Sequence, residues 1–155
     1  PPHHFLSGTK QGLAGIVSTR GNQNCHVILR GGKSGPNYES EHVEGALALL
    51  QKAGIQRGVM VDLSHANSNK NHENQPKVAS DLAKQIAGGN RGLVGVMIES
   101  NITAGRQNAA PGKPLTYGQS ITDACLGFEE TVPVLEELAE SIKARRGIPS
   151  NKNID

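Results

Sequence analysis

The chain has 155 residues, a formal net charge of +2 at pH 7, 19 glycines, 8 prolines and few aromatic residues. A net charge this small gives no reason to expect a nucleic-acid or membrane-surface partner, and no apolar run approaches the ~20 residues that cross a bilayer. Two cysteines far apart in the sequence favour a reduced, cytoplasmic protein. Length and glycine content together predict one loop-rich α/β domain.

The first predicted elements are an antiparallel hairpin and a third strand. Strand-like residues at 5–9 and 15–19 flank a Lys-Gln-Gly turn. The segment CHVILR at 25–30 is the next predicted strand, and two glycines and a lysine follow it. Apolar residues at helical spacing then predict a helix over 41–53, which ends at a glycine.

Two short apolar runs in the middle of the chain are suited to buried parallel strands. The first is VMVDLSHAN at 59–67, and the second is GLVGVMIESN at 92–101. A helix is predicted between them at 76–87. Each run ends in polar residues, so His65 and Glu99 are expected at the C-terminal mouth of one sheet, where α/β barrels place their active sites.

The last third of the chain begins with a long loop rich in glycine and proline at 103–118, of a length that is often functional or mobile. The segment SITD at 120–123 then leads into a predicted helix over about 131–145. Residues 148–155 are predicted to form a polar tail with frayed structure.

The predicted order is a hairpin followed by three strand–helix units, which implies a parallel sheet with crossover connections. Three strands cannot close a barrel, because about eight are needed, and a sheet of three leaves open edges. We therefore interpret residues 1–147 as the C-terminal part of a TIM (β/α)8 barrel: its last three βα units plus an inserted hairpin at about 5–19. The start of the chain, without methionine and close to a strand, fits the middle of a longer protein.

Arg30 is the first candidate functional residue, because it follows a strand and precedes two glycines. A guanidinium group there suits bidentate binding of a phosphate or carboxylate, and the glycines let a ligand approach the backbone. The alternative is an arginine in an ordinary ion pair at the end of a strand.

A second candidate set consists of His65, Glu99 and Asp123, an imidazole and two carboxylates suited to Mn²⁺, Fe²⁺, Co²⁺ or Zn²⁺. The alternatives are a hydrogen-bonded histidine, a glutamate that caps a helix and an aspartate at the N-cap of the last helix. Asp62 either orients a ligand or is a buried structural carboxylate. Packed positions are expected for three other side chains: Cys25, Cys125 and His26.

Five segments carry a resemblance to a known family: CHVILRGGK, VMVDLSHANSNK, QIAGG, GVMIESN and YGQSITDACLGFEET. They resemble the type I 3-deoxy-D-arabino-heptulosonate 7-phosphate (DAHP) synthases, from residue 2 to about residue 147. The resemblance implies a (β/α)8 barrel and a metal-dependent condensation of phosphoenolpyruvate with erythrose 4-phosphate that releases phosphate. This reaction opens the shikimate pathway of aromatic amino acid biosynthesis.

The resemblance also assigns roles to the candidate residues. It implies that His65, Glu99 and Asp123 bind a divalent metal (Mn, Fe, Co or Zn) and that Arg30 binds the phosphate of phosphoenolpyruvate. Arg30, His65 and Asp123 are accordingly the expected catalytic residues. The family's fourth metal ligand, a cysteine of the first barrel strand, and its KPRT loop for erythrose 4-phosphate are absent from this sequence. We therefore expect the isolated segment to be inactive and the parent protein to be active.

In the hairpin, Phe5 and Ser7 match the region that forms the family's pocket for an aromatic amino acid inhibitor. Ser7 is more similar to the phenylalanine-responsive branch, although Gly8 replaces the more usual valine. A homo-oligomer is also expected. Two further hypotheses remain: a non-catalytic regulatory or assembly piece, and another barrel aldolase that uses phosphoenolpyruvate, such as an octulosonate phosphate synthase.

Overall fold

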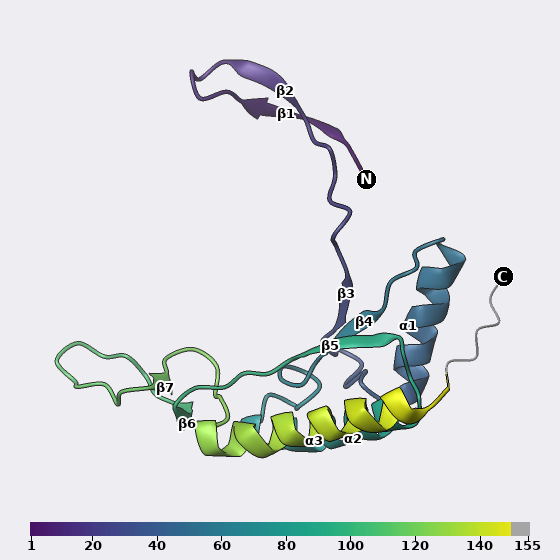
Figure 1. Ribbon diagram of the computed structural model, residues 1–155. Helices are drawn as coiled ribbons and strands as arrows, with labels where there is room; N and C mark the ends of the chain where they lie inside the picture. Colours follow the sequence, from purple (N-terminus) through teal and green to yellow (C-terminus); the bar gives the residue numbers. More distant parts are fainter. Residues whose placement is uncertain (150–155) are drawn as a thin grey trace.

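The computed structural model describes residues 1–149, and within that range its central layer is a three-stranded parallel sheet (Figure 1). The strands lie in the order β3 (Val27–Leu29), β4 (Val59–Asp62) and β5 (Leu93–Met97). This confirms the predicted parallel strands, although β3 is shorter than the segment 25–30. The three strands end at the same edge of the sheet, where the polar residues that follow them can meet.

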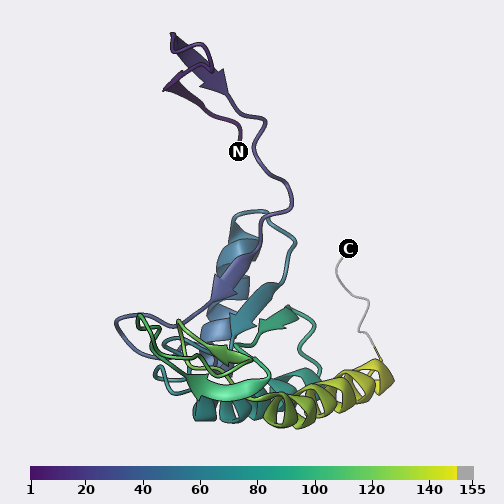
Figure 2. The same cartoon turned by 90° about the vertical axis from the view of Figure 1, so that its left-hand side faces the viewer.

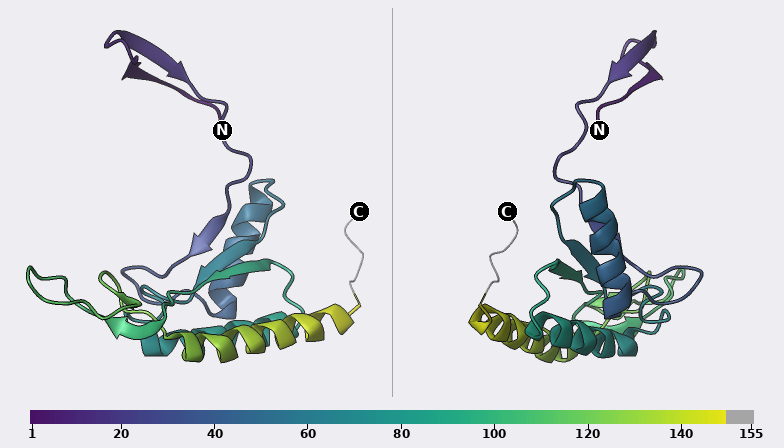
Figure 3. Two further views of the ribbon diagram at one scale, coloured as in Figure 1. Left: turned by 60° about the vertical axis from the view of Figure 1, so that its left-hand side comes forward. Right: turned by 90° about the vertical axis from the view of Figure 1, so that its right-hand side faces the viewer.

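Three helices cover the sheet: α1 (Ser40–Lys52), α2 (Gln75–Ala87) and α3 (Phe128–Gly147). Helices α2 and α3 pack side by side, and α1 contacts β4 (Figure 3). The core lies between β4 and the helices, because alternate residues of a strand point to one face. Its buried apolar side chains include Val43, Val59, Val61, Leu63, Val78, Leu82, Ile86, Leu126 and Val134.

The predicted hairpin is confirmed as β1 (His4–Gly8) and β2 (Ala14–Ser18), which pair antiparallel with Phe5 opposite Val17. It stands away from the sheet at the end of an extended stretch of chain (Figures 1 and 2). Apolar side chains are exposed on both of its faces, namely Phe5, Leu6, Leu13, Ile16 and Val17.

The stretch that joins the hairpin to the sheet corrects two expectations. Cys25 and His26 are exposed rather than packed, because they precede β3 and belong to the extended connection. Cys125 is half-buried, and burial raises the pKa of its thiol, as expected for a packed cysteine.

The region predicted as a continuous loop at 103–118 begins with a strand. Within it, β6 (Thr103–Arg106) pairs parallel with β7 (Gln119–Ser120). The last helix starts three residues earlier than predicted, and its N-cap is Gly127. The alternative in which Asp123 caps this helix is therefore wrong.

A short 3-10 helix, η1 (His72–Asn74), precedes α2. Beyond residue 149, the predicted polar tail lies outside the described residues. None of the helices in the described range has the length and hydropathy required to span a bilayer.

Candidate metal and anion site

His65, Glu99 and Asp123 converge at the C-terminal edge of the parallel sheet. One potential ligand atom from each residue lies within 4.8 Å of those of the other two. His65 follows β4, Glu99 follows β5, and Asp123 lies between β7 and α3. The three residues line a cavity of about 200 Å³ together with Arg30 and Lys70. Separate segments thus deliver a nitrogen and two carboxylates to one place.

The backbone after β4 coils tightly so that the imidazole of His65 faces the cavity. His65 has a positive φ of 49°, a left-handed conformation that is uncommon outside glycine. The carbonyl of His65 accepts a hydrogen bond from the N–H of Lys70 at 2.7 Å, and that of Ser64 accepts one from the N–H of Ser68 at 3.2 Å. Strained conformations of this kind are concentrated at functional sites.

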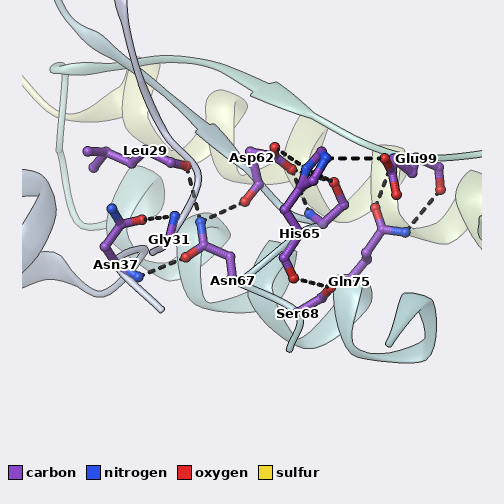
Figure 4. Close-up of polar contacts among 10 residues, drawn as sticks. Leu29, Gly31, Asn37, Asp62, His65, Asn67, Ser68, Gln75 and Glu99 are labelled. Carbon is purple, nitrogen blue, oxygen red and sulfur yellow. Dashed lines mark hydrogen bonds and ion pairs between the residues drawn. The ribbon is translucent and has the colours of Figure 1, made fainter. Parts of the chain in front are cut away.

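Asp62 fixes the orientation of the His65 ring (Figure 4). The Oδ2 atom of Asp62 lies 2.6 Å from Nδ1 of His65, and its Oδ1 atom accepts the N–H of Ser64 at 2.8 Å. The carboxylate is almost fully buried, at 1% exposure. In the neutral tautomer that donates its Nδ1 proton to Asp62, Nε2 is the ring atom available to a metal, and it lies 3.6 Å from Oε1 of Glu99.

The backbone of Glu99 is held by two segments. The amide side chain of Gln75 donates to the Glu99 carbonyl at 3.0 Å and accepts the Glu99 N–H at 2.9 Å. The N–H of Leu126 donates to the same carbonyl at 2.9 Å, and the Leu126 carbonyl accepts the N–H of Asn101 at 2.9 Å. Because Leu126 is only three residues beyond Asp123, this pairing brings the Asp123 carboxylate beside Glu99.

Burial raises the pKa of the Glu99 carboxyl above its ordinary value. His65 acts in the opposite direction, whereas the nearby carboxylate of Asp123 raises the pKa further. Two acidic groups that face each other and an imidazole in a partly enclosed cavity form an arrangement that a divalent cation would neutralise.

Arg30 follows β3 directly and lines the same cavity. Among residues 1–149, its guanidinium takes part in none of the ion pairs, so the alternative of an ordinary ion pair is not what the described structure contains. The position of Arg30 beside three metal-ligand candidates suits a ligand that carries an anionic group and also contacts a cation.

A buried amide links the loop of Arg30 to the loop of His65. The side chain of Asn67 donates to the carbonyls of Leu29 at 3.1 Å and Asp62 at 2.7 Å. Its oxygen accepts the N–H of Asn37 at 2.7 Å, and the side chain of Asn37 accepts the N–H of Gly31 at 2.7 Å (Figure 4). The two loops therefore share one hydrogen-bond network.

The chain matches a family model over residues 2–136, and the description of that model is "DAHP synthetase I family". The chain belongs to this family. A tyrosine-inhibited phospho-2-dehydro-3-deoxyheptonate aldolase of Schizosaccharomyces pombe is 54% identical over 150 residues, which cover 94% of this chain and 40% of that protein. A Phe-sensitive phospho-2-dehydro-3-deoxyheptonate aldolase of Escherichia coli is 52% identical over 146 residues, which cover 94% of this chain and 41% of that protein.

The fold of this chain is similar to that of a solved structure. The phospho-2-dehydro-3-deoxyheptonate aldolase from Francisella tularensis matches with a TM-score of 0.85 and 56% identity, over 95% of this chain and 42% of that one. The chain thus spans about 40% of the length of these relatives. The family match also weighs against the hypothesis of an octulosonate phosphate synthase.

Within this DAHP synthetase fold, sequence reasoning missed several residues that line or organise the cavity, among them His72, which lines it. Gln75 and Asn67 act on backbone atoms of distant segments, and Lys70 is brought to the cavity by the coiled loop after β4. Lys70 lies within the SHANSNK string, so its proximity to His65 was the available signal. Gln75 gave no signal, because its partners lie 24 residues further along the chain.

Phe5 and Ser7 are not part of the cavity. Both lie on one face of β1, since they are two residues apart in a strand. Ser7 lies opposite Gly15, and the ring of Phe5 stacks on the ring of His3 with centroids 5.5 Å apart. The hairpin thus presents a separate surface with an aromatic ring and a hydroxyl.

Proposed function

We propose that this chain is the C-terminal part of the (β/α)8 barrel of a DAHP synthase. The supporting features are the share of its relatives that it spans and the state of its sheet. Parallel strands are normally covered on both faces, yet Val27 and Ile28 of β3 are about 40% exposed and Val94 of β5 is 62% exposed. Both outer strands also have unpaired edges within the described structure, as expected where further barrel strands would pair.

The proposed reaction of the complete protein is the condensation of phosphoenolpyruvate with erythrose 4-phosphate. The observation that carries it is the convergence of His65, Glu99 and Asp123 within 4.8 Å. Their nitrogen and oxygen donors fit Mn²⁺, Fe²⁺, Co²⁺ or Zn²⁺, and a bound ion would supply Lewis-acid polarisation of the aldehyde.

The chain's own residues have distinct tasks in this proposal. Asp62 holds the His65 ring so that Nε2 faces the carboxylates. Arg30 binds the phosphate of phosphoenolpyruvate and fixes the direction from which its enol carbon approaches the aldehyde. The network through Asn67 sets the spacing between Arg30 and His65.

The competing hypothesis is a regulatory or assembly piece without a catalytic role. His65→Ala in the full-length protein separates the two hypotheses. The proposed function requires loss of metal-dependent activity with the fold retained, as judged by circular dichroism. The regulatory hypothesis requires little change. His42→Ala is the matched control, because His42 is an exposed histidine on α1 and lies outside the cavity.

We also propose that the hairpin face with Phe5 and Ser7 binds an aromatic amino acid inhibitor, with phenylalanine favoured, in a homo-oligomer. The exposed ring of Phe5 and the partly buried hydroxyl of Ser7 offer stacking and hydrogen bonding to such a ligand. Titration of the full-length protein with phenylalanine, tyrosine and tryptophan tests this role. If none of the three amino acids changes the activity, the proposed inhibitor-binding role of the hairpin is wrong.

A further inference from the structure

The hydrogen bonding of β5 changes at its C-terminal end. Strand β4 pairs with β5 as far as Asp62 opposite Met97, and the N–H of Leu63 donates to the Met97 carbonyl at 2.9 Å. The chain then leaves the sheet and turns at His65. Toward β4, Glu99 consequently has no strand partner: its carbonyl is met by a backbone donor only from Leu126, and its N–H still needs an acceptor.

Gln75 replaces that missing strand. Its side-chain oxygen accepts the N–H of Glu99 at 2.9 Å and its side-chain nitrogen donates to the Glu99 carbonyl at 3.0 Å, the pattern of a neighbouring strand residue (Figure 4). Gln75 is the first residue of α2 and is 0% exposed. A buried amide with both ends used on a single residue fixes the position of that residue along the strand and across it.

We propose that Gln75 is a positioning residue that holds Glu99 in the geometry required to bind the metal. The inference rests on the proposed metal-binding role of Glu99. Gln75 does not touch the reacting atoms; it acts through the backbone from which the Glu99 carboxylate projects toward His65, whose Nε2 lies 3.6 Å from Oε1. Residues that orient metal ligands in this indirect way typically contribute a factor of roughly 10 to 100 in metal affinity.

The test uses Gln75→Met in the full-length protein, because methionine has a similar length and suits a helix but cannot form either hydrogen bond. The matched control is Gln85→Met on the same helix. Gln85 also donates from its side chain to a distant backbone carbonyl, that of Tyr38 at 2.9 Å, but it lies outside the cavity of the metal site. The readout is the dissociation constant for Mn²⁺, measured from the electron paramagnetic resonance signal of the free ion.

The expected result is a dissociation constant roughly 10- to 100-fold higher for Gln75→Met and unchanged for Gln85→Met, with similar losses of melting temperature without metal. Equal Mn²⁺ affinity of wild type and Gln75→Met overturns the inference and leaves the proposed function intact. Absence of Mn²⁺ binding by the wild type overturns the proposed function and this inference together.

Should Gln75→Met not fold, Gln75→Glu serves in its place, since it keeps the acceptor for the Glu99 N–H and loses the donor to the carbonyl. Wild-type affinity in that variant overturns the inference too.

Discussion

At the scale of single residues, Gly31 is a point of close approach between the Arg30 loop and the His65 loop. Its φ is +73°, and a Cβ built on it would lie 2.7 Å from the Cβ of Ala66 and 2.9 Å from the amide nitrogen of Asn67. Only a residue without a side chain permits both this backbone conformation and this approach. The spacing between the proposed phosphate-binding and metal-binding groups therefore depends on one glycine.

Gly31→Ala is expected to destabilise the full-length protein by at least about 1 kcal/mol and to weaken binding of phosphoenolpyruvate. The added methyl group separates the two loops and displaces Arg30 from the cavity. Gly32→Ala is the control, because its Cβ would meet no atom within 4 Å. Urea unfolding and a phosphoenolpyruvate titration check both effects, and equal behaviour of the two variants would contradict the prediction.

Residues at strand ends could be predicted from the sequence, and Asp62 was a candidate to orient a ligand, whereas the supporting amides could not be predicted. His65 and Glu99 follow apolar runs that a parallel sheet must bury, so their convergence follows from topology. Asp123 was also a candidate from the residues alone, but strand order did not imply its convergence with the other two, since its position depends on the pairing of Leu126 with Glu99. Gln75 was invisible in the sequence because its partners are backbone atoms, which every residue carries.

At the scale of elements, the start of α3 illustrates a missing signal. Ser, Thr, Asp and Asn mark helix N-termini because their side chains accept backbone N–H groups. Here the N-cap is Gly127, which has no such side chain. The Glu130 carboxylate instead accepts the Gly127 N–H at 2.7 Å. The helix therefore begins at Phe128, before the apolar spacing becomes evident in the sequence.

Glu130→Ala is expected to destabilise the protein by about 1 kcal/mol. The substitution removes the carboxylate that accepts the Gly127 N–H, and it removes a negative charge from the helix N-terminus. Glu129→Ala is a close control, because Glu129 lies in the same first turn and its substitution removes the same charge. Thermal unfolding should lower the melting temperature more for Glu130→Ala than for Glu129→Ala. An equal loss in both variants would assign the whole effect to charge and none to the cap.

At the scale of the whole molecule, the described sheet is too small to enclose a site. The cavity is lined by groups that follow β3, β4, β5 and β7. Parallel sheets are normally covered on both faces, and an unpaired outer strand is a place where a further strand can pair. The number of strands in the sequence led to the prediction that further strands complete the sheet, and the chain spans about 40% of its relatives.

The isolated 155-residue segment is expected to show no turnover with phosphoenolpyruvate, erythrose 4-phosphate and Mn²⁺, whereas the full-length protein turns over under the same conditions. The segment offers three candidate metal ligands. Arg30 is the one arginine within its described residues that lines the cavity. We therefore expect that the segment holds neither the metal nor two phosphorylated substrates fully. Phosphate release in a steady-state assay measures the difference, with circular dichroism to establish that the segment is folded. Full-length protein carrying His65→Ala gives the background rate. Clear turnover by the folded segment above that background would mean that the convergence of His65, Glu99 and Asp123 is sufficient for catalysis, contrary to the proposal that the site is completed by other barrel strands.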